Sequence, residues 1–563
     1  MKLKYLLLIL LFVNTLKHQA QINSHIIIPK AVRIDSDLTT NNSIYSIVNF
    51  NTPSYAIQNQ TITNVSGMVG NNLGYDTAIL KFNGNFVLQD YWHFGGSGSE
   101  GFTVIHEDNN KNVYALLEIQ AAITIDNVLY QAPPQSEIHS LIIKFNSNGQ
   151  IAWVKRINEF LIQPKIKTYN NEIFIAGQYK GMSLTIENTT VSGNQVHPQL
   201  SETFLAKFNA TNGSLQWLRT SETTVGVNEN NMGTHCVDLE LDQNGNAVLI
   251  ANLFSPAVKF GTTNVSFVTN NAVSNNAVTV IAKYSNAGNV SWAKAPTVMN
   301  NRLLFAEDLD IDGTGNIYVS ANATGGVNYW GTSVNPSFTT TGMYGHLFKL
   351  NASGSFQWAK ANTNIQGGLK IYGIKCVQND VVATYHALNS QIIDNQTINI
   401  SNTSAILGVF GSNGTLKSYK LHVPDNPDPN RFYITNILHY SSAGYILSGN
   451  QSADIILDNS YPMPLPNPTN FTNNFIIKSG EFASAKEIVV DKWKLYPNPA
   501  KDEFFVEGEE LSLQYKIYDL SGRIVDENSL RNSKINISNL SNGIYVVELA
   551  NDEFMQRVKI IKE

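Results

Sequence analysis

The chain has 563 residues, of which 43% are apolar and 15% are charged, and its formal net charge is −6 at pH 7. A chain of this length is too long for one ordinary domain, and its apolar content is enough to bury a sizeable core. The acidic balance and the lack of basic runs argue against a nucleic-acid partner and against an anionic membrane surface.

The amino terminus has the three-part pattern of a secretory signal peptide. It begins Met-Lys-Leu-Lys, continues with an apolar run over residues 5–13, and reaches the small residue Ala20 before Gln21. This run is far shorter than the roughly 20 apolar residues of a membrane-spanning helix. We therefore expect residues 1–20 to be a signal peptide cleaved near Ala20, and the mature chain to lack a membrane span.

One segment then recurs along the chain. Residues 142–153 show it best and read Ile-Ile-Lys-Phe-Asn-Ser-Asn-Gly-Gln-Ile-Ala-Trp, which is a β-rich run, an Asn/Gly turn and a second run ending in an aromatic residue. This pattern is typical of a β-hairpin. The copies centre on positions 81, 144, 207, 283, 349, 409 and 478, so neighbouring copies lie 60 to 76 residues apart. The spacing predicts seven units.

A second hairpin precedes the first in each unit, most clearly over residues 309–321, and the earliest example covers residues 32–45. Two hairpins give four strands, which is the content of a propeller blade. The repeated motifs resemble the β-propeller repeats of secreted bacterial proteins. That resemblance implies an all-β propeller over residues 26–490, with seven four-stranded blades; six or eight blades are alternatives. A linear β-solenoid or a string of small sandwiches is the rival architecture, but a closed ring would remove exposed strand edges.

Several repeated residues have a structural interpretation. We expect the lysines to lay their stems over apolar surface with the ammonium groups in water. The tryptophans should pack between blades with a partner for each indole N–H. Cys236 and Cys376 lie in apolar runs of different units, and we expect two buried side chains rather than a disulfide. The lysines are Lys81, Lys144, Lys207, Lys283, Lys349 and Lys478, and the tryptophans are Trp153, Trp217, Trp292 and Trp358.

No catalytic, zinc or phosphate-binding motif is present, so we predict no catalytic residue and no bound cofactor. The alternating carboxylates Asp308, Asp310 and Asp312 are the first half of a calcium loop, but Val319 stands where the loop needs a bidentate Glu. We interpret Asp312 as a turn residue that accepts nearby backbone amides. A Ca²⁺ site at these three residues is the alternative.

Three long loops connect the last strand of one unit to the first strand of the next. In a propeller such loops gather on one face, and loops on a rigid scaffold often carry binding residues. The loops at residues 220–234, 296–307 and 421–435 lead us to expect a binding face that includes Glu229, Arg302, Asp425, Asp428 and Arg431. Ordinary solvated loop polarity is the alternative.

The composition changes near residue 491, since 23 of the last 73 residues are charged against 59 of the preceding 490. This tail contains Tyr496-Pro-Asn-Pro, Tyr518-Asp-Leu-Ser-Gly-Arg and Gly543-Ile-Tyr-Val. It resembles the type A C-terminal sorting domain that Bacteroidetes attach to cargo of the type IX secretion system. The resemblance implies a small Ig-like β-sandwich over residues 491–563 that is removed during export. The family motif falls on Pro497, Asn498, Pro499, Gly522, Gly543 and Tyr545.

Together these features predict a secreted or cell-surface protein that is exported by the type IX secretion machinery. We expect its propeller to be a binding or adhesion module for a glycan or a protein, and not an enzyme. An extracellular polysaccharide hydrolase or lyase, with carboxylates at the channel mouth, is one alternative. A structural surface adhesin is the other.

Overall fold

The computed structural model describes most of the chain. The described residues are 22–28, 31–33, 43–69, 72–131, 138–193, 200–224, 233–255, 257–266, 277–298, 303–334, 343–361, 363–364, 369–400, 403–425, 432–441, 444–452, 454–457, 461–463, 473–479, 493–508, 513–519, 523–530, 533–550 and 555–563. The expected signal peptide, residues 1–20, lies outside them. All regular elements in these ranges are strands, which confirms the all-β prediction. The described residues contain no helix that is long and apolar enough to cross a membrane.

The chain forms two compact units, Met1–Phe482 and Ala483–Glu563. The boundary expected near residue 490 lies outside the described residues. Within the described part of the first unit, called the body here, the main strands form seven successive four-stranded antiparallel groups, called sheets 1 to 7. Strand pairing extends sheets 2 and 3 into neighbouring hairpins, and one parallel pair, Tyr344 with Leu369, joins sheets 5 and 6.

The first three sheets contain one unit of the repeat each. Sheet 1 is β2 (Ala31–Arg33), β3 (Ile44–Phe50), β8 (Asp76–Phe82) and β9 (Leu88–Phe94). Sheet 2 is β10 (Glu100–Glu107), β11 (Val113–Ile119), β14 (His139–Phe145) and β15 (Ile151–Ile157). Sheet 3 is β16 (Ile162–Tyr169), β17 (Glu172–Lys180), β20 (Ser201–Asn209) and β21 (Leu215–Thr224).

The next three sheets repeat this order. Sheet 4 is β22 (Thr234–Leu241), β23 (Ala247–Leu253), β26 (Val278–Tyr284) and β27 (Val290–Lys294). Sheet 5 is β29 (Leu304–Ile311), β30 (Ile317–Ala323), β33 (Tyr344–Leu350) and β34 (Phe356–Ala361). Sheet 6 is β36 (Leu369–Val377), β37 (Asp380–Ala387), β40 (Ser404–Gly411) and β41 (Leu416–His422).

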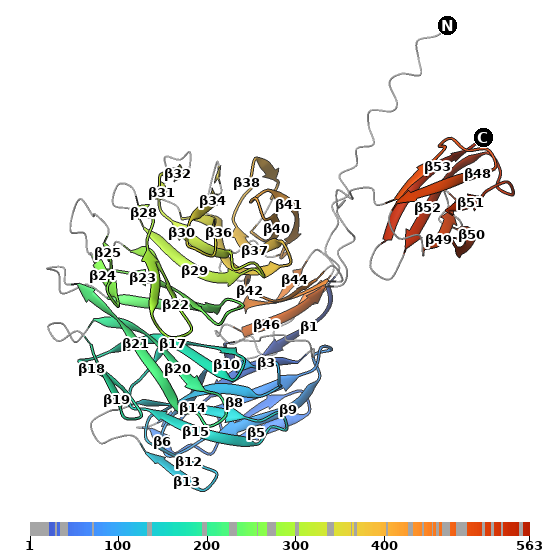
Figure 1. Cartoon of the computed structure of the whole chain (residues 1–563). Coiled ribbons are helices and arrows are strands. Elements are labelled where there is room, and N and C mark those ends of the chain that lie inside the picture. Colours follow the sequence, from blue (N-terminus) through green and yellow to red (C-terminus); the bar gives the residue numbers. More distant parts are fainter. Residues whose placement is uncertain are drawn as a thin grey trace. The chain divides into compact units, whose positions relative to one another are not determined.

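The last sheet joins both ends of the body. Sheet 7 is β42 (Phe432–Ser441), β43 (Gly444–Gln451), β46 (Asn473–Ser479) and β1 (Ile22–Ile28), and β1 pairs antiparallel with β46 along its length. In Figure 1 the blue strand β1 accordingly lies beside the orange strand β46. The final repeat lacks a strand ending in Trp, and β1 takes its place as the fourth strand of sheet 7.

Short hairpins project between the second and third strands of each sheet. They account for the polar insertions in the repeats, and four two-residue strands accompany them. The hairpins are β4 (Ser54–Ile57) with β5 (Gln60–Thr63), β12 (Ala122–Ile125) with β13 (Val128–Gln131), β18 (Ser183–Ile186) with β19 (Thr189–Ser192), β24 (Ala257–Phe260) with β25 (Thr263–Ser266), β31 (Val327–Tyr329) with β32 (Thr332–Val334), β38 (Gln391–Ile393) with β39 (Gln396–Ile398), and β44 (Ile455–Leu457) with β45 (Tyr461–Met463). The short strands are β6 (Met68–Val69), β7 (Asn72–Leu73), β28 (Thr297–Val298) and β35 (Thr363–Asn364).

The apolar cores of the body lie between consecutive sheets. Each core combines residues of one sheet with residues of the next, from sheets 1 and 2 through to sheets 6 and 7. A further core joins sheet 7 back to sheet 1, where Ile28 and Ile476 pack in the same cluster as Val48 and Phe50. The series of cores therefore returns to its starting point.

The repeated lysines link each sheet to the next one. Their ammonium groups donate to backbone carbonyl groups of the following sheet, at 2.8 to 3.2 Å. The expectation that these groups lie in water was wrong, because the following sheet covers them. The pairs are Lys144 with Ala210, Lys207 with Asn286, Lys283 with Ala352 and Lys349 with Ser412. Lys478 of sheet 7 donates in the same way to Gly84 of sheet 1, at 3.0 Å.

Tryptophans and buried amides make further links between sheets. The indole N–H groups of Trp153, Trp217 and Trp358 donate to carbonyl groups of the next sheet, as predicted. Asn322 of sheet 5 is fully buried and clasps β36, since its amide donates to the Ile371 carbonyl and accepts from the Ile371 N–H, both at 2.9 Å. Such bidentate contacts fix the first strand of a sheet against the preceding sheet.

The two cysteines are both free thiols. Cys236 is buried in β22, as expected, whereas Cys376 in β36 is only half-buried. They belong to different sheets, and their role is packing.

The second unit consists of two sheets around one core. One sheet is β47 (Trp493–Tyr496), β48 (Glu503–Gly508) and β51 (Lys534–Asn536), and the other is β50 (Ile524–Ser529), β49 (Gln514–Tyr518), β52 (Gly543–Ala550) and β53 (Met555–Lys562). Trp493 and Phe504 of the first sheet share a buried cluster with Ile517, Val547 and Ile560 of the second. The alternating apolar pattern of the tail therefore forms short strands with one buried face.

Candidate binding cavity

A cavity of about 380 Å³ lies where the first strands of sheets 2 to 7 meet. Its wall is formed by β10, β16, β22, β29, β36 and β42, with contributions from β43 and β46. Residues from six sheets therefore face one space. The volume falls within the range of small-molecule sites, roughly 300 to 1,000 Å³.

A β-bulge interrupts each first strand at the cavity. The pairing of β10, β16, β22, β29, β36 and β42 with their second strands is shifted in register within each strand. A bulge bends the strand and redirects side chains. The residues that resume pairing after the bulge all line the cavity, and they are Val104, Lys165, Asp238, Asp308, Ile374 and Asn436.

One side of the cavity is charged and is called the charged wall here. It comprises Lys165, Lys167, Asp238, Glu240, Glu307, Asp308, Asp310 and Lys375, from β16, β22, β29 and β36. Ion pairs cross from strand to strand. Lys165 Nζ lies 3.3 Å from Asp238 Oδ1, and Lys167 Nζ lies 2.6 Å from Glu240 Oε1. The ammonium of Lys375 lies 3.8 Å from Asp310 Oδ2.

Asp238 and Asp308 touch each other within this wall, because their carboxyl groups share a hydrogen bond. Burial, followed by the negative charge of Asp238, holds the pKa of Asp308 well above its usual range. Burial alone would also raise the pKa of Asp238, but Lys165 and Lys167 outweigh it and lower that pKa. Of the two carboxyl groups, Asp308 is therefore the one that holds its proton more firmly.

Backbone contacts hold this pair in place. Asp308 Oδ2 accepts from the Ile374 N–H at 2.7 Å, and Asp238 Oδ2 accepts from the Leu309 N–H at 3.3 Å. Burial also raises the pKa of Glu240, to about 7, with Lys167 opposing the shift and Asp310 adding to it. The charged wall thus contains fixed carboxyl groups of which some retain their protons near neutral pH.

Another part of the cavity lining is neutral and polar, and it is called the amide wall here. It comprises Thr435, Asn436, Ser448, Asn450 and Asn474, from β42, β43 and β46. Hydroxyl and carboxamide groups can both donate and accept hydrogen bonds. The cavity lining therefore combines ionic groups with uncharged hydrogen-bonding groups.

The predicted binding-face residues do not line this cavity where they are described. Asp425 is exposed, and its carboxylate accepts from the Ile456 N–H at 2.8 Å. Glu229, Arg302, Asp428 and Arg431 lie outside the described residues. A role for these five residues in ligand binding stays a prediction. Of the charged wall, only Asp308 and Asp310 were singled out from the sequence, as possible calcium ligands. Its other residues were not, although polar residues alternate along the first strand of several units.

The three aspartates proposed for calcium diverge. Asp308 and Asp310 face the cavity, whereas Asp312 lies in the following turn and accepts from the N–H groups of Thr314 and Asn316, both at 2.9 Å. The interpretation of Asp312 as a turn residue is confirmed. Within the described ranges, no group of three or more His, Cys, Asp or Glu side chains is placed to hold a metal ion.

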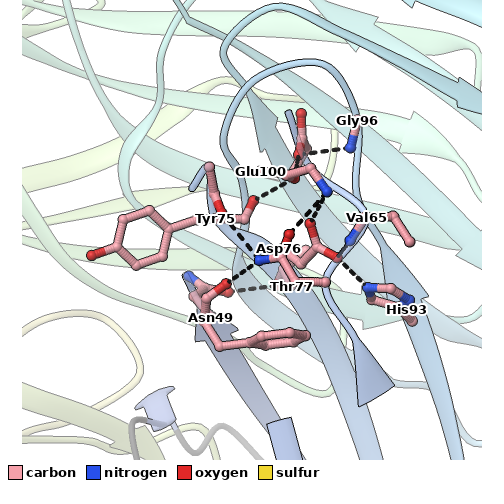
Figure 2. A network of polar contacts seen from close by, with 12 residues as sticks. Asn49, Val65, Tyr75, Asp76, Thr77, His93, Gly96 and Glu100 are labelled. Atoms are coloured by element: carbon pink, nitrogen blue, oxygen red, sulfur yellow. Dashed lines mark hydrogen bonds and ion pairs between the residues drawn. The ribbon is translucent and has the colours of Figure 1, made fainter. Parts of the chain in front are cut away.

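A second buried network links sheet 1 to sheet 2, away from the cavity (Figure 2). The Asp76 carboxylate accepts from the N–H groups of Val65 and Ser66 at 2.7 and 2.9 Å, and lies 2.6 Å from His93 Nε2. Glu100 accepts from the Ser66 hydroxyl and the Gly96 N–H, both at 2.9 Å. These contacts fix two loops between neighbouring sheets, which is a structural role.

The tail residues of the sorting motif lie close to the last strands. Asn498 pairs with β53, since its amide donates to the Lys559 carbonyl at 2.8 Å and accepts from the Ile561 N–H at 2.9 Å. Gly543 begins β52, and Tyr545 OH donates to the Ser541 carbonyl at 2.8 Å. Pro497 and Pro499 flank Asn498, and Gly522 lies outside the described residues. The Pro-Asn-Pro segment is thus tied to the carboxy-terminal strand.

No curated protein matches this sequence. Solved structures match it at low identity, and three of them serve as examples. PorZ, a surface component of the type-IX secretion system of Porphyromonas gingivalis, is 10% identical with a TM-score of 0.16, over 97% of this chain and 100% of that chain. Puromycin hydrolase is 9% identical with a TM-score of 0.31, over 74% of this chain and 59% of that chain. The rhamnogalacturonan lyase of Bacillus licheniformis is 10% identical with a TM-score of 0.26, over 80% and 83%. TM-scores this low do not establish a shared fold.

The tail gives a more specific match. Residues 494–563 match the family described as the secretion system C-terminal sorting domain. The match covers the two-sheet unit and includes the described sorting residues from Pro497 to Tyr545. It supports assigning the chain to the cargo of the type IX secretion system, secreted and attached to the outer cell surface.

Proposed function

We propose that the protein is a secreted β-propeller whose central cavity binds a glycan. The seven four-stranded sheets are its blades, and the two-sheet unit is an Ig-like sorting domain that delivers the chain to the type IX machinery. Residues 1–20 direct the first export step as a signal peptide. A propeller is supported by the series of interfaces, which leads from sheet 1 to sheet 7 and back to sheet 1.

One observation carries the binding function. Six sheets converge on one cavity, and its lining combines ion pairs with amide and hydroxyl groups. A saccharide presents many hydroxyl groups, each able to donate and accept, and such a ligand can satisfy a wall of this kind. Fixed polar groups on a rigid scaffold favour selective binding, because little conformational freedom is lost when the ligand enters.

A polysaccharide hydrolase or lyase is the second candidate, since carboxyl groups do converge in the cavity. However, the carboxyl groups of Asp238 and Asp308 touch, whereas the two catalytic carboxyl groups of glycoside hydrolases stand roughly 5 to 10 Å apart. The touching pair therefore does not have the spacing of that chemistry. For this pair, the geometry favours binding over glycoside hydrolysis.

The test exposes the purified full chain to an array of surface and algal polysaccharides, and scores retention and released reducing ends together. The double variant Lys375→Met with Asn436→Ala removes one polar group from each wall of the cavity. Lys417→Met is the matched control, because Lys417 forms an exposed ion pair with Asp380 at 2.8 Å outside the cavity.

We expect retention without release for the wild type and the control, and retention reduced at least about tenfold for the double variant, as for the loss of two hydrogen-bonding groups. Release of reducing ends would overturn the proposal in favour of an enzyme. Retention that survives in the double variant would place the ligand elsewhere. No retention on any glycan would favour a protein partner or a structural adhesin.

A further inference from the structure

One of the lysine links between sheets has a side-chain partner as well as a backbone partner. Lys207 Nζ of β20 lies 2.6 Å from Asn286 Oδ1 and 3.2 Å from the Asn286 carbonyl oxygen. Asn286 lies in the turn between β26 and β27. The other lysines of these links meet residues whose side chains have no amide, namely Ala210, Ala352, Ser412 and Gly84. A carboxamide in contact with the amine therefore sets the Lys207 link apart from those links.

Glu172, the first residue of β17, contacts both of these side chains. Its Oε1 lies 2.5 Å from Lys207 Nζ, and its Oε2 accepts from Asn286 Nδ2 at 2.7 Å. Asn286 Nδ2 also donates to the Gly245 carbonyl at 3.3 Å. The carboxylate of Glu172 thus has one oxygen against the amine of Lys207 and the other against the amide nitrogen of Asn286.

Aromatic rings shield the amine from water. Lys207 is only 4% exposed, and its Nζ lies 5.5 Å from the centre of the Phe174 ring. Trp217 packs edge-on against Phe174, and its indole N–H donates to the Asn286 carbonyl at 3.1 Å. A site that excludes water strengthens electrostatic interactions and keeps hydrolysis from competing with other reactions.

These contacts bring together a nucleophile, an electrophile and a base. An amine becomes a nucleophile when an adjacent base takes its proton, and a carboxylate is a suitable base. Because Oδ1 is bonded to Cγ, its contact with Nζ holds the amine of Lys207 next to the amide carbon of Asn286. Such proximity removes much of the entropic barrier to a reaction between two groups.

We propose that Lys207 and Asn286 form an intramolecular isopeptide bond, with Glu172 as the catalytic residue that carries the proton. Glu172 Oε1 takes a proton from Lys207 Nζ, and the neutral amine attacks Asn286 Cγ. The Nζ–Cγ bond forms, the Cγ–Nδ2 bond breaks, and ammonia leaves. Of the two protons that the ammonium of Lys207 gives up, one leaves with Nδ2 in the ammonia, through Glu172, and the other passes to solvent. The reaction needs no oxidant or reductant.

The bond ties sheet 3 covalently to sheet 4. Lys207 and Asn286 are 79 positions apart, so the link closes a long loop and restricts the unfolded chain, as a disulfide does. The cysteines of the chain, Cys236 and Cys376, are free thiols. An isopeptide bond gives a secreted protein a covalent brace that does not depend on the redox conditions outside the cell.

The test is mass spectrometry of the purified, denatured protein, first intact and then after proteolysis. We expect the wild type to be lighter than its sequence by one molecule of ammonia, and a branched peptide to join Lys207 to Asn286. The branched peptide separates this loss from the cyclisation of an amino-terminal Gln21, which also releases ammonia.

Variants test the role of each side chain. Lys207→Met removes the nucleophile and should abolish the branched peptide. Glu172→Gln keeps the size of the side chain but removes the base, so the cross-linked fraction should fall at least about tenfold. Lys349→Met is the matched control, because Lys349 meets the Ser412 carbonyl at 3.1 Å in another pair of sheets, and it should keep the branched peptide in full.

The result for the wild type does not depend on whether a variant folds. A wild-type protein without the branched peptide would overturn the proposal. A branched peptide at the wild-type level in Glu172→Gln would overturn the catalytic role of Glu172. Neither result bears on glycan binding, because Glu172, Lys207 and Asn286 do not line the cavity.

Discussion

The amide clasp of Asn322 offers a direct test of how the sheets are joined. The side chain is fully buried and makes three hydrogen bonds, two of them to the backbone of Ile371 in β36 and one to Glu307. Asn322→Ala removes all three and leaves the Ile371 N–H and carbonyl without this partner. Each buried backbone group left unsatisfied costs about 1 to 3 kcal/mol. We therefore expect the free energy of unfolding to fall by about 3 kcal/mol.

The assay is urea-induced unfolding of the full chain, followed by tryptophan fluorescence. Asn264→Ala makes the same chemical change at an exposed position of β25 and should alter the free energy of unfolding by less than about 0.5 kcal/mol. Asn252 makes an equivalent clasp on Ala306, with contacts of 3.3 and 2.9 Å, so Asn252→Ala should behave like Asn322→Ala. A loss below about 1 kcal/mol for both clasp variants would refute the idea that these amides hold neighbouring sheets together.

Three further predictions concern other polar contacts of the body. Lys478→Met should lower the free energy of unfolding by about 1 to 2 kcal/mol, because it removes the bond from sheet 7 to Gly84 of sheet 1; an unchanged urea midpoint would contradict this link. Asp76→Asn should destabilise the protein by about 1 to 3 kcal/mol at pH 7. Burial acts to raise the pKa of Asp76, but hydrogen bonds from His93, Ser66 and Val65 outweigh burial and lower this pKa. The stabilisation is therefore present above the unfolded pKa of 3.8 and is lost as the pH falls through the folded pKa. The difference between wild type and variant should shrink below about pH 4 in pH-dependent urea titrations, and a constant difference would count against the prediction. Burial raises the pKa of Glu118 to about 8, whereas the unfolded chain releases this proton near pH 4.5. The wild type should therefore lose stability as the pH rises from about 4.5 to 8, and Glu118→Gln should not. Parallel stability curves for the two proteins would contradict this prediction.

Much of the fold could be predicted from the sequence, because local signals carry it. Asn/Gly turns and β-rich runs predict the hairpins, and the spacing of Lys144, Lys207 and their counterparts predicts the number of units. These signals depend on residues a few positions apart. The pairing of β1 with β46 was not predicted, since its partners are separated by about 450 residues in the chain, between Ile26 and Ile476. The missing fourth strand of the last repeat was the available clue.

The candidate site was harder to predict for the same physical reason. Lys165, Asp238 and Asp308 come from three different units, and only the packing of sheet on sheet brings them together. Each one alone reads as an ordinary polar residue in a strand. The bulges that turn them toward the cavity leave no simple sequence pattern. From the sequence we therefore expected the ligand at the loops near Asp425, whereas the described structure presents a polar cavity between the first strands.

The most direct measurement is a crystal structure of the full chain soaked with a glycan that the array retains. The account predicts electron density for the saccharide inside the cavity, between the charged wall at Asp308 and the amide wall at Asn436. Density for the saccharide at the outer strands or at the loops, with the cavity holding none, would contradict the assignment of the cavity as the binding site.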